Sequence, residues 1–434
     1  MPWLFRGGIC GVGSYRNHIA AGGAVVEHDA LPLKGVRVAD FCWVWIGPYC
    51  TKLLAMLGAE VIKVEGHKRT DLTRHSVVWP LPEPATTEVP PNQGMAFNAL
   101  NMNKRSVTLD LTTAQGVALA KQVALLSDVV VDNMRPGFMK RIGLGYEELS
   151  QLRPDIIVAS CSSRGQSGPE SGYAGYATIH HAIGGGSYIT GYPDDAPCHS
   201  SADPDLMNGT TAAYAILAAL FHRARTGDGQ FIDYSQCEGV TSLLGDLLLD
   251  YDMNGEVPER MGNAHPEYAP HNVYPCWGVD RWLALEVQSN QEFATLANIM
   301  GQPQLARDPR FADMVSRKSN EVELDRIISE WTRARDRDWL VSELCRAGLV
   351  AAPSRDASDL YADPHLRARD AFVTVVHPEL GELELVGPPF KMSDCALRTE
   401  RAPLFGEHND YVLRELLGIA EAEVSSLRRE EVIL

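Results

Sequence analysis

The first 250 residues alternate short apolar segments with longer amphipathic ones. Short runs of β-branched and apolar residues predict buried strands, whereas apolar residues spaced three or four apart predict helices. The strands are expected at 33–41, 59–64, 106–111, 128–132 and 156–160, and the helices at 47–57, 114–126, 146–152, 208–222 and 235–254. A strand, a helix and a strand in succession form a βαβ unit with parallel strands. Its repetition predicts an α/β fold with a doubly wound, Rossmann-like parallel sheet.

The pattern changes after about residue 255. Proline-rich turns, one clear strand at 282–287 and three helical segments predict a smaller α+β domain. The tail again carries strand patterns, at 372–376 and 383–386, and a helical one at 410–417. We therefore expect an N-terminal extension (1–30), the first part of a large α/β domain (31–225), a linker helix with the small domain (226–360), and a return to the large domain (361–434).

Composition narrows the class of protein. The chain of 434 residues is 45% hydrophobic and 22% charged, as is typical of globular proteins, and its net charge of −17 argues against a nucleic-acid surface. No apolar run approaches the roughly 18 residues that cross a membrane, and residues 1–30 lack the apolar core of a secretory signal. Nine scattered cysteines without a C-x-x-C pair predict reduced thiols, a cytoplasmic protein and no metal site.

Basic residues gather after three of the predicted strands. The groups are Lys68, Arg69 and Arg74; Lys104 and Arg105; and Arg135, Lys140 and Arg141. Open α/β sheets bind ligands at the carboxyl ends of their strands, so the groups together predict a site for a polyphosphate. For any single residue, solvated surface charge is the simpler interpretation. No G-x-G-x-x-G follows a strand and no P-loop motif occurs.

Asp205 has an unusual context. It lies in Ala202-Asp203-Pro204-Asp205-Leu206-Met207-Asn208-Gly209, just ahead of an alanine-rich apolar stretch. An Asp before a helix is first of all an N-cap. A short carboxylate held by a turn is also suited to act as a nucleophile. These residues alone leave both interpretations open.

Five separated segments of the chain resemble those of a known protein family. They are 33–65, Asn101–Ser106, Asn133–Gly137, Arg223–Gln230 and Gly406–Asp410. In order and in spacing they resemble the class III CoA-transferases, the family that includes formyl-CoA and carnitine CoA-transferases and α-methylacyl-CoA racemase. The similarity spans about residues 31–420. It implies acyl-CoA and a carboxylic acid as substrates, no tightly bound cofactor, and an interlocked homodimer or a heteromer with a second chain of the family.

The resemblance also implies roles for individual residues. Asp205, four residues before Gly209, matches the nucleophile, whereas Asp203 stands two residues too early. The implied CoA contacts are Val44, Trp45, Ile46, Leu109, Asn133, Met134 and Arg141. Gly66 replaces a family arginine, so we assign the CoA phosphates to Lys68, Arg69, Lys104 and Arg105. Oxyanion donors are expected near Gly184–Gly186 or at the Asp205 turn.

Two alternatives accompany the transferase interpretation. The family's racemase pairs the Asp with a His, and the matching position here is Tyr176, in Gly175-Tyr176-Ala177. With a reference pKa of about 10, tyrosine is a poor base for an α-proton near neutral pH. Some family members work as two unlike chains, so a non-catalytic subunit is the second alternative.

Overall fold

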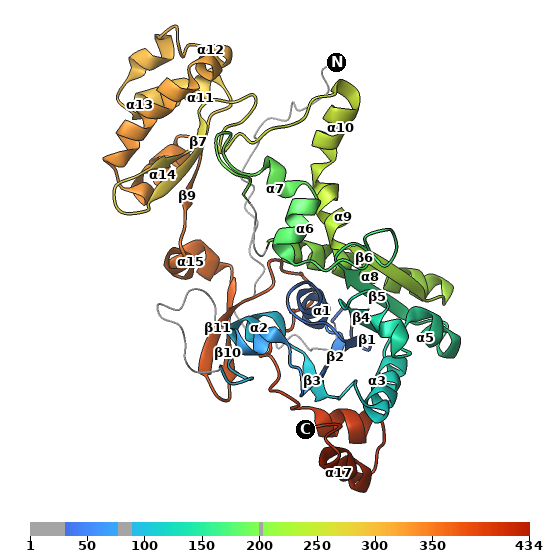
Figure 1. The fold of residues 1–434 in the computed structure, drawn as a ribbon. Coiled ribbons are helices and arrows are strands. Elements are labelled where there is room, and N and C mark those ends of the chain that lie inside the picture. The colour runs from blue at the N-terminus through green and yellow to red at the C-terminus, as the bar shows by residue number, and fades with distance from the viewer. Residues whose placement is uncertain (1–30, 77–88, 199–202) are drawn as a thin grey trace.

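The computed structural model describes residues 31–76, 89–198 and 203–434, and the predicted N-terminal extension lies outside them. Its centre is a six-stranded, fully parallel sheet in the order β3-β2-β1-β4-β5-β6 (Figure 1). The strands are β1 (Arg37–Asp40), β2 (Glu60–Glu65), β3 (Arg105–Thr108), β4 (Val129–Asp132), β5 (Ile157–Ser162) and β6 (Gln230–Ser235). This order confirms the predicted doubly wound α/β fold, and its switch point lies between β1 and β4.

Helices cover both faces of this sheet. They are α1 (Ile46–Met56), α2 (Met95–Leu100), α3 (Ala114–Leu126), α4 (Phe138–Arg141), α5 (Tyr146–Leu152), α6 (Ala177–Ile183), α7 (Gly186–Ile189), α8 (Asp203–Thr226), α9 (Gln236–Thr241) and α10 (Gly245–Asn254), with 3₁₀ turns at Leu72–His75 and Ser242–Leu244. Helices α1 and α8 share one core with β1, β4 and β5, and α3 and α5 belong to a second core on the opposite face. Because both faces are covered, central strands such as Val129–Val131 are apolar throughout.

A smaller antiparallel sheet has its own core. It contains β7 (His271–Pro275), β8 (Trp282–Glu286) and β9 (Val350–Ser354), with α11 (Asn290–Ile299), α12 (Met314–Ser319), α13 (Glu321–Arg333), α14 (Arg337–Arg346) and a 3₁₀ turn at Pro303–Arg307. Phe293, Leu324 and Leu340 are fully buried between these helices and the sheet. Only β8 was expected from the sequence, because β7 and β9 each contain a proline and little apolar alternation.

The C-terminal segment packs against the large sheet. It comprises α15 (Ala357–Ala362), α16 (Pro364–Ala368), the hairpin β10 (Phe372–His377) and β11 (Gly381–Val386), a π-helical turn (Tyr411–Leu416) and α17 (Glu421–Arg429). Val412, Leu413 and Val424 join the core that holds α3. The Asn409 carboxamide oxygen accepts a hydrogen bond from the Thr108 N–H at 2.8 Å and so occupies the open edge of β3.

Three differences from the predicted elements concern the site. Strand β6 extends the parallel sheet beyond residue 225, where we expected its first part to end. Helix α8 begins at Asp203 rather than near residue 208, and the helix expected over 235–254 is divided into α9, a 3₁₀ turn and α10. Among the described residues, no helix is both long and apolar enough to span a bilayer.

Candidate active site

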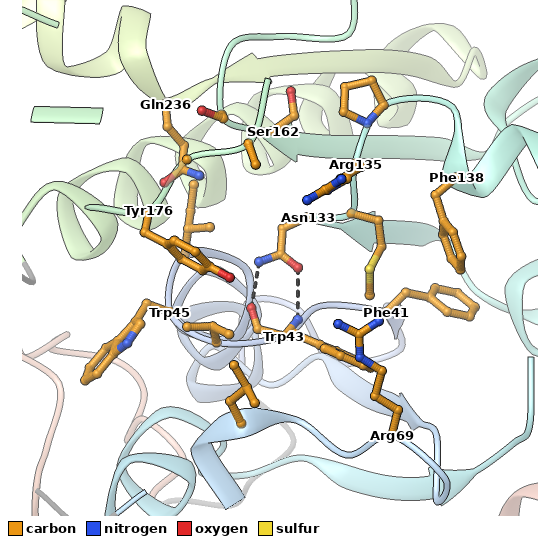
Figure 2. A pocket seen from close by; sticks show the side chains of 18 of the residues that line it. Phe41, Trp43, Trp45, Arg69, Asn133, Arg135, Phe138, Ser162, Tyr176 and Gln236 are labelled. Carbon is orange, nitrogen blue, oxygen red and sulfur yellow. Dashed lines mark hydrogen bonds between the residues drawn. The ribbon is translucent and has the colours of Figure 1, made fainter. Parts of the chain in front are cut away.

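A cavity of about 740 Å³ opens at the switch point of the large sheet (Figure 2). Its walls are the segments that follow β1, β2, β4 and β5, and the beginnings of α6 and α8. The lining includes Phe41, Trp43, Val44, Trp45, Ile46, Lys68, Arg69, Asn133, Met134, Arg135, Phe138, Arg141, Ser162, Tyr176, His180, Asp205 and Gln236. Loops at the carboxyl ends of parallel strands therefore form this cavity, as is usual for ligand sites in such sheets.

The loop after β1 is held by a side chain from the loop after β4. The Asn133 carboxamide oxygen accepts from the Trp43 N–H at 2.9 Å, and its nitrogen donates to the Trp43 carbonyl at 2.6 Å (Figure 2). Asn133 was predicted to contact CoA. The structure places it in the cavity wall, where it fixes the two loops on either side of the switch point.

Val44 has a strained backbone in this loop. Its φ of 62° lies in the left-handed region, which is unfavourable for a β-branched residue. Its N–H donates to Asp71 Oδ1 at 3.2 Å, and Lys63 Nζ lies 3.1 Å from Asp71 Oδ2. Such strain, typically about 1–3 kcal/mol, persists only where the surroundings enforce it, as the buried Lys63–Asp71 pair does here.

Asp205 lies in the first turn of α8 and reaches the cavity. Its position corrects our expectation of a turn ahead of the helix, since α8 already begins at Asp203. The residue is only 7% exposed, because α8 packs tightly on α1. At Gly209, a Cβ atom would lie 2.9 Å from the Ile46 carbonyl oxygen, so only glycine permits this approach of the two helices.

Burial controls the ionisation of Asp205. It raises the pKa of this carboxyl from 3.8 to about 7, because the charged form loses its hydration in the cavity wall. Near neutral pH the carboxylate is therefore partly ionised and poorly solvated. A carboxylate in this condition is a stronger nucleophile than one in water.

His180 is the neighbour of Asp205 that the sequence reasoning missed. Its Nδ1 lies 3.9 Å from Asp205 Oδ1, and burial, aided by the nearby Arg164 charge, lowers its pKa to about 4. No role was predicted for His180 from the sequence. Tyr176 caps the start of α6 and lines the same cavity, and residues four apart share a helix face, so this spacing was the available signal.

Three of the five predicted phosphate or CoA cations border the cavity. Lys68 Nζ pairs with Asp110 Oδ2 at 2.8 Å, the Arg69 guanidinium lies 5.2 Å from the Trp43 ring centre, and Arg141 lies 5.3 Å from that of Phe138. Arg135 also lines the cavity (Figure 2). Together they give this end of the cavity a positive character on an otherwise acidic protein.

The other two cations, Lys104 and Arg105, do not reach this cavity, and neither does Leu109. Lys104 Nζ is buried 3.0 Å from Asp40 Oδ2, Arg105 pairs with Glu60, and Leu109 is fully buried in the core. Their predicted contacts with CoA are therefore not supported. Lys104 supplies the countercharge that the buried Asp40 needs, which is a structural role.

Of the two positions expected for the oxyanion donors, the start of α8 at Asp205 borders the cavity. Gly184–Gly186 do not line the cavity, whereas Trp45 and Ile46 do, and α1 begins at Ile46. The first N–H groups of a helix have no acceptor within it. The start of α1 thus presents backbone donors on the same side of the sheet as Asp205.

Fold and site define an α/β protein whose switch-point cavity combines several cations with a desolvated carboxylate. The model of CoA-transferase family III matches residues 33–409, and the chain therefore belongs to this family. The predicted resemblance is confirmed, and the protein is a CoA-transferase, of the EC 2.8.3 type, whose substrates are CoA thioesters.

Relatives agree with this assignment. The chain is 35% identical to a succinyl-CoA–D-citramalate CoA-transferase of Chloroflexus aurantiacus, over 93% of this chain and 98% of the relative. It is 33% identical to the beta subunit of a succinyl-CoA–L-malate CoA-transferase of the same organism, over 93% and 98%. Among solved structures, a CAIB/BAIF family protein from Brucella suis is 32% identical, with a TM-score of 0.79 over 89% of this chain and 99% of that one.

Proposed function

We propose that this chain moves CoA from an acyl-CoA donor to a free carboxylic acid through covalent intermediates on Asp205. One observation carries the proposal: Asp205 is a buried carboxylate in the wall of the switch-point cavity, with its pKa raised by burial. The cations around Arg69 and Arg141 border the same cavity and suit the phosphates of CoA.

The chemistry balances without an external acid or base. The Asp205 carboxylate attacks the thioester carbonyl, the C–S bond breaks, and a mixed anhydride and CoA thiolate result. The thiolate attacks the Asp205 carbonyl carbon, releasing the first acid as its carboxylate and leaving an aspartyl-CoA thioester. The acceptor carboxylate attacks this thioester, and the freed thiolate then attacks the acceptor carbonyl, which restores Asp205.

The surroundings of Asp205 suit each of these steps. Burial weakens the hydration of the nucleophile, and the contact of α8 with α1 fixes its backbone. Each tetrahedral intermediate carries an oxyanion. We assign its stabilisation to backbone N–H groups at the start of α1, around Trp45 and Ile46.

The substrates that we propose are dicarboxylic. Succinyl-CoA is named as the donor for both Chloroflexus relatives, and their named acceptors are D-citramalate and L-malate. The test is transfer by the purified chain alone from succinyl-CoA to a panel of mono- and dicarboxylic acids. Trapping of an aspartyl-CoA adduct on the peptide that contains Asp205 is expected. A chain inactive alone but active with a co-purified second chain would instead be a subunit.

Removal of charge tests the CoA groove. Arg69→Gln and Arg141→Gln should raise the KM for acyl-CoA several-fold more than the KM for the free acid, because only CoA carries phosphates. Lys140→Gln is the matched control, since Lys140 pairs with Glu147 at 2.6 Å and does not line the cavity. Equal effects of the arginine variants on both substrates would contradict the assignment.

One observation favours a second activity, the exchange of the α-proton that underlies acyl-CoA racemisation. The residue expected to replace the racemase histidine, Tyr176, is accompanied by His180 beside Asp205. A neutral imidazole and a carboxyl with a pKa of about 7 can act as base and acid. The test is deuterium uptake at the α-carbon of a 2-methylacyl-CoA in D₂O. Transfer without deuterium uptake would exclude this activity.

A further inference from the structure

The imidazole of His180 is buried, and its interaction with the Gly175 backbone falls short of an ordinary hydrogen bond. His180 is 1% exposed, and neither ring nitrogen has a partner of ordinary hydrogen-bond geometry within the described part of the chain. An unpaired buried polar group costs about 1–3 kcal/mol, so nearly all such groups in proteins are paired. The unpaired imidazole therefore indicates a partner that is gained when substrate binds.

The nearest group with the right chemistry is the carboxyl of Asp205. The 3.9 Å between Nδ1 and Oδ1 is too long for a hydrogen bond, but a movement of about 1 Å would reach the usual length. Both side chains line the cavity, from α6 and from α8. Occupation of the cavity can therefore bring the two together.

The Nε2 side of the His180 ring packs closely against Gly175. A methyl group on Gly175 would lie 2.8 Å from His180 Nε2 and 2.5 Å from Ser163 Oγ. The Gly175 backbone therefore packs against the Nε2 edge of the ring, in a space that only glycine leaves open.

The charged groups that interact with the ring are Asp205 on α8 and Arg164 after β5. Titratable residues near it in the fold are Cys237 on α9, and Tyr176 and His181 on its own helix. Arg164 and burial both disfavour the imidazolium, so the ring stays neutral. An ionised carboxylate only accepts hydrogen bonds, so His180 contributes to the nucleophilic state of Asp205 only by donating from Nδ1.

We propose that His180 is a positioning residue for Asp205, donating from Nδ1 to the ionised carboxylate in the acyl-CoA complex and fixing its direction of attack. The inference rests on the proposed role of Asp205. A hydrogen bond from His180 favours the ionised form of Asp205 and so lowers the pKa that burial raises. The ascending limb of the pH–rate profile should therefore lie at lower pH with His180 than without it.

The test compares three substitutions with one control. His180→Ala should lower kcat by about 10- to 100-fold, in line with the loss of one hydrogen bond to a charged group, with little change in the KM for acyl-CoA. The ascending limb should also move to higher pH. His180→Asn, whose amide takes the place of Nδ1, should restore most of kcat and the limb. His180→Gln, whose amide takes the place of Nε2, should not.

His181→Ala is the control, because His181 pairs with Ser187 at 3.0 Å and does not line the cavity. A His180→Ala protein with wild-type kcat and pH profile, in an enzyme that does transfer CoA, would overturn the inference alone. So would equal kcat values for the Asn and Gln variants. A wild-type chain without aspartyl-CoA formation would instead overturn the proposed function.

Discussion

At the scale of the residue, the site depends on a carboxylate that the fold desolvates. Asp205 is 7% exposed, and burial is the cause of its raised pKa. In the folded chain Asp205 keeps its proton up to a pH of about 7, whereas in the unfolded chain the carboxyl ionises near pH 3.8. The free energy of unfolding must therefore fall as the pH rises between these values. The ionised form of Asp205, which the proposed mechanism requires, thus lowers the stability of the folded chain.

This cost predicts the pH dependence of one variant. Asp205→Asn removes the ionisation, so the variant should gain stability relative to the wild type from pH 5 to pH 8. A shift from 3.8 to about 7 corresponds to at most roughly 4 kcal/mol, at about 1.4 kcal/mol per unit. Unfolding midpoints of both proteins measured at pH 5 and pH 8 check this. Midpoints that differ by the same amount at both pH values would contradict it.

For single residues, the sequence predicted the site best where the end of a strand or a family motif fixed the position of the residue. The positions of Asp205, Asn133 and Arg69 in a single cavity followed from strand order and the resemblance. Lys104 was misassigned because a basic residue after a strand serves a buried Asp40 as well as it serves a phosphate. His180 was missed because its value depends on a neighbour 25 positions away in the chain.

At the scale of the element, the contact of α1 with α8 aligns the two sides of the cavity. The start of α1 supplies backbone donors and the start of α8 supplies Asp205. Gly209 lies where the two helices meet, four residues after the carboxylate. The distance between the proposed nucleophile and the proposed oxyanion donors is therefore set by the packing of two helices rather than by a loop.

Gly209→Ala tests this dependence. The added methyl group would lie 2.9 Å from the Ile46 carbonyl oxygen and 3.1 Å from the Tyr49 ring, and a backbone oxygen yields only if α1 moves. We expect a fall in kcat of at least 10-fold and a stability loss of about 1–3 kcal/mol. Gly245→Ala, where a methyl group meets nothing within 4 Å, is the matched control. Equal kcat values for the two variants would show that the helix contact does not set the geometry.

The strands were predicted best where both faces of the strand are buried. The central strands of the large sheet read as continuous apolar runs, which the hydrophobic pattern identifies well. Strand β6 was missed because it is an edge strand in which half-buried and exposed positions alternate and only Ser235 is buried. Gly239 lies inside α9 and does not end it, and the breaks after Thr241 and Leu244 have no proline beside them, so periodicity alone predicts one helix over 235–254.

At the scale of the whole molecule, several helices expose large apolar side chains. Tyr214 and Phe221 on α8 are 72% and 65% exposed, and Leu248, Leu249 and Tyr251 on α10 are similarly exposed. None of the residues of α10 is buried in the single chain. Exposed apolar surface of this extent is typical of a protein interface. This agrees with the interlocked dimer that the resemblance implies, which remains a prediction.

The dimer has a direct test. Two interlocked chains cannot separate without unfolding, so the molecular mass from light scattering should remain that of a dimer on dilution. The α10 variant Leu249→Glu should lower the yield of folded protein rather than produce a stable monomer. A native monomer of either protein would contradict the prediction, and a stable complex with a different chain would indicate the heteromer.

The most direct test of the central claim follows oxygen atoms. In the proposed pathway the acceptor acid leaves one of its carboxylate oxygens on Asp205 at the end of each turnover. After many turnovers with an ¹⁸O-labelled acceptor acid and acyl-CoA, mass spectrometry of the peptide that contains Asp205 should show ¹⁸O in that side chain. The Asp205→Asn variant should show none. Active transfer with no label in Asp205, or with label in another carboxylate, would contradict the account.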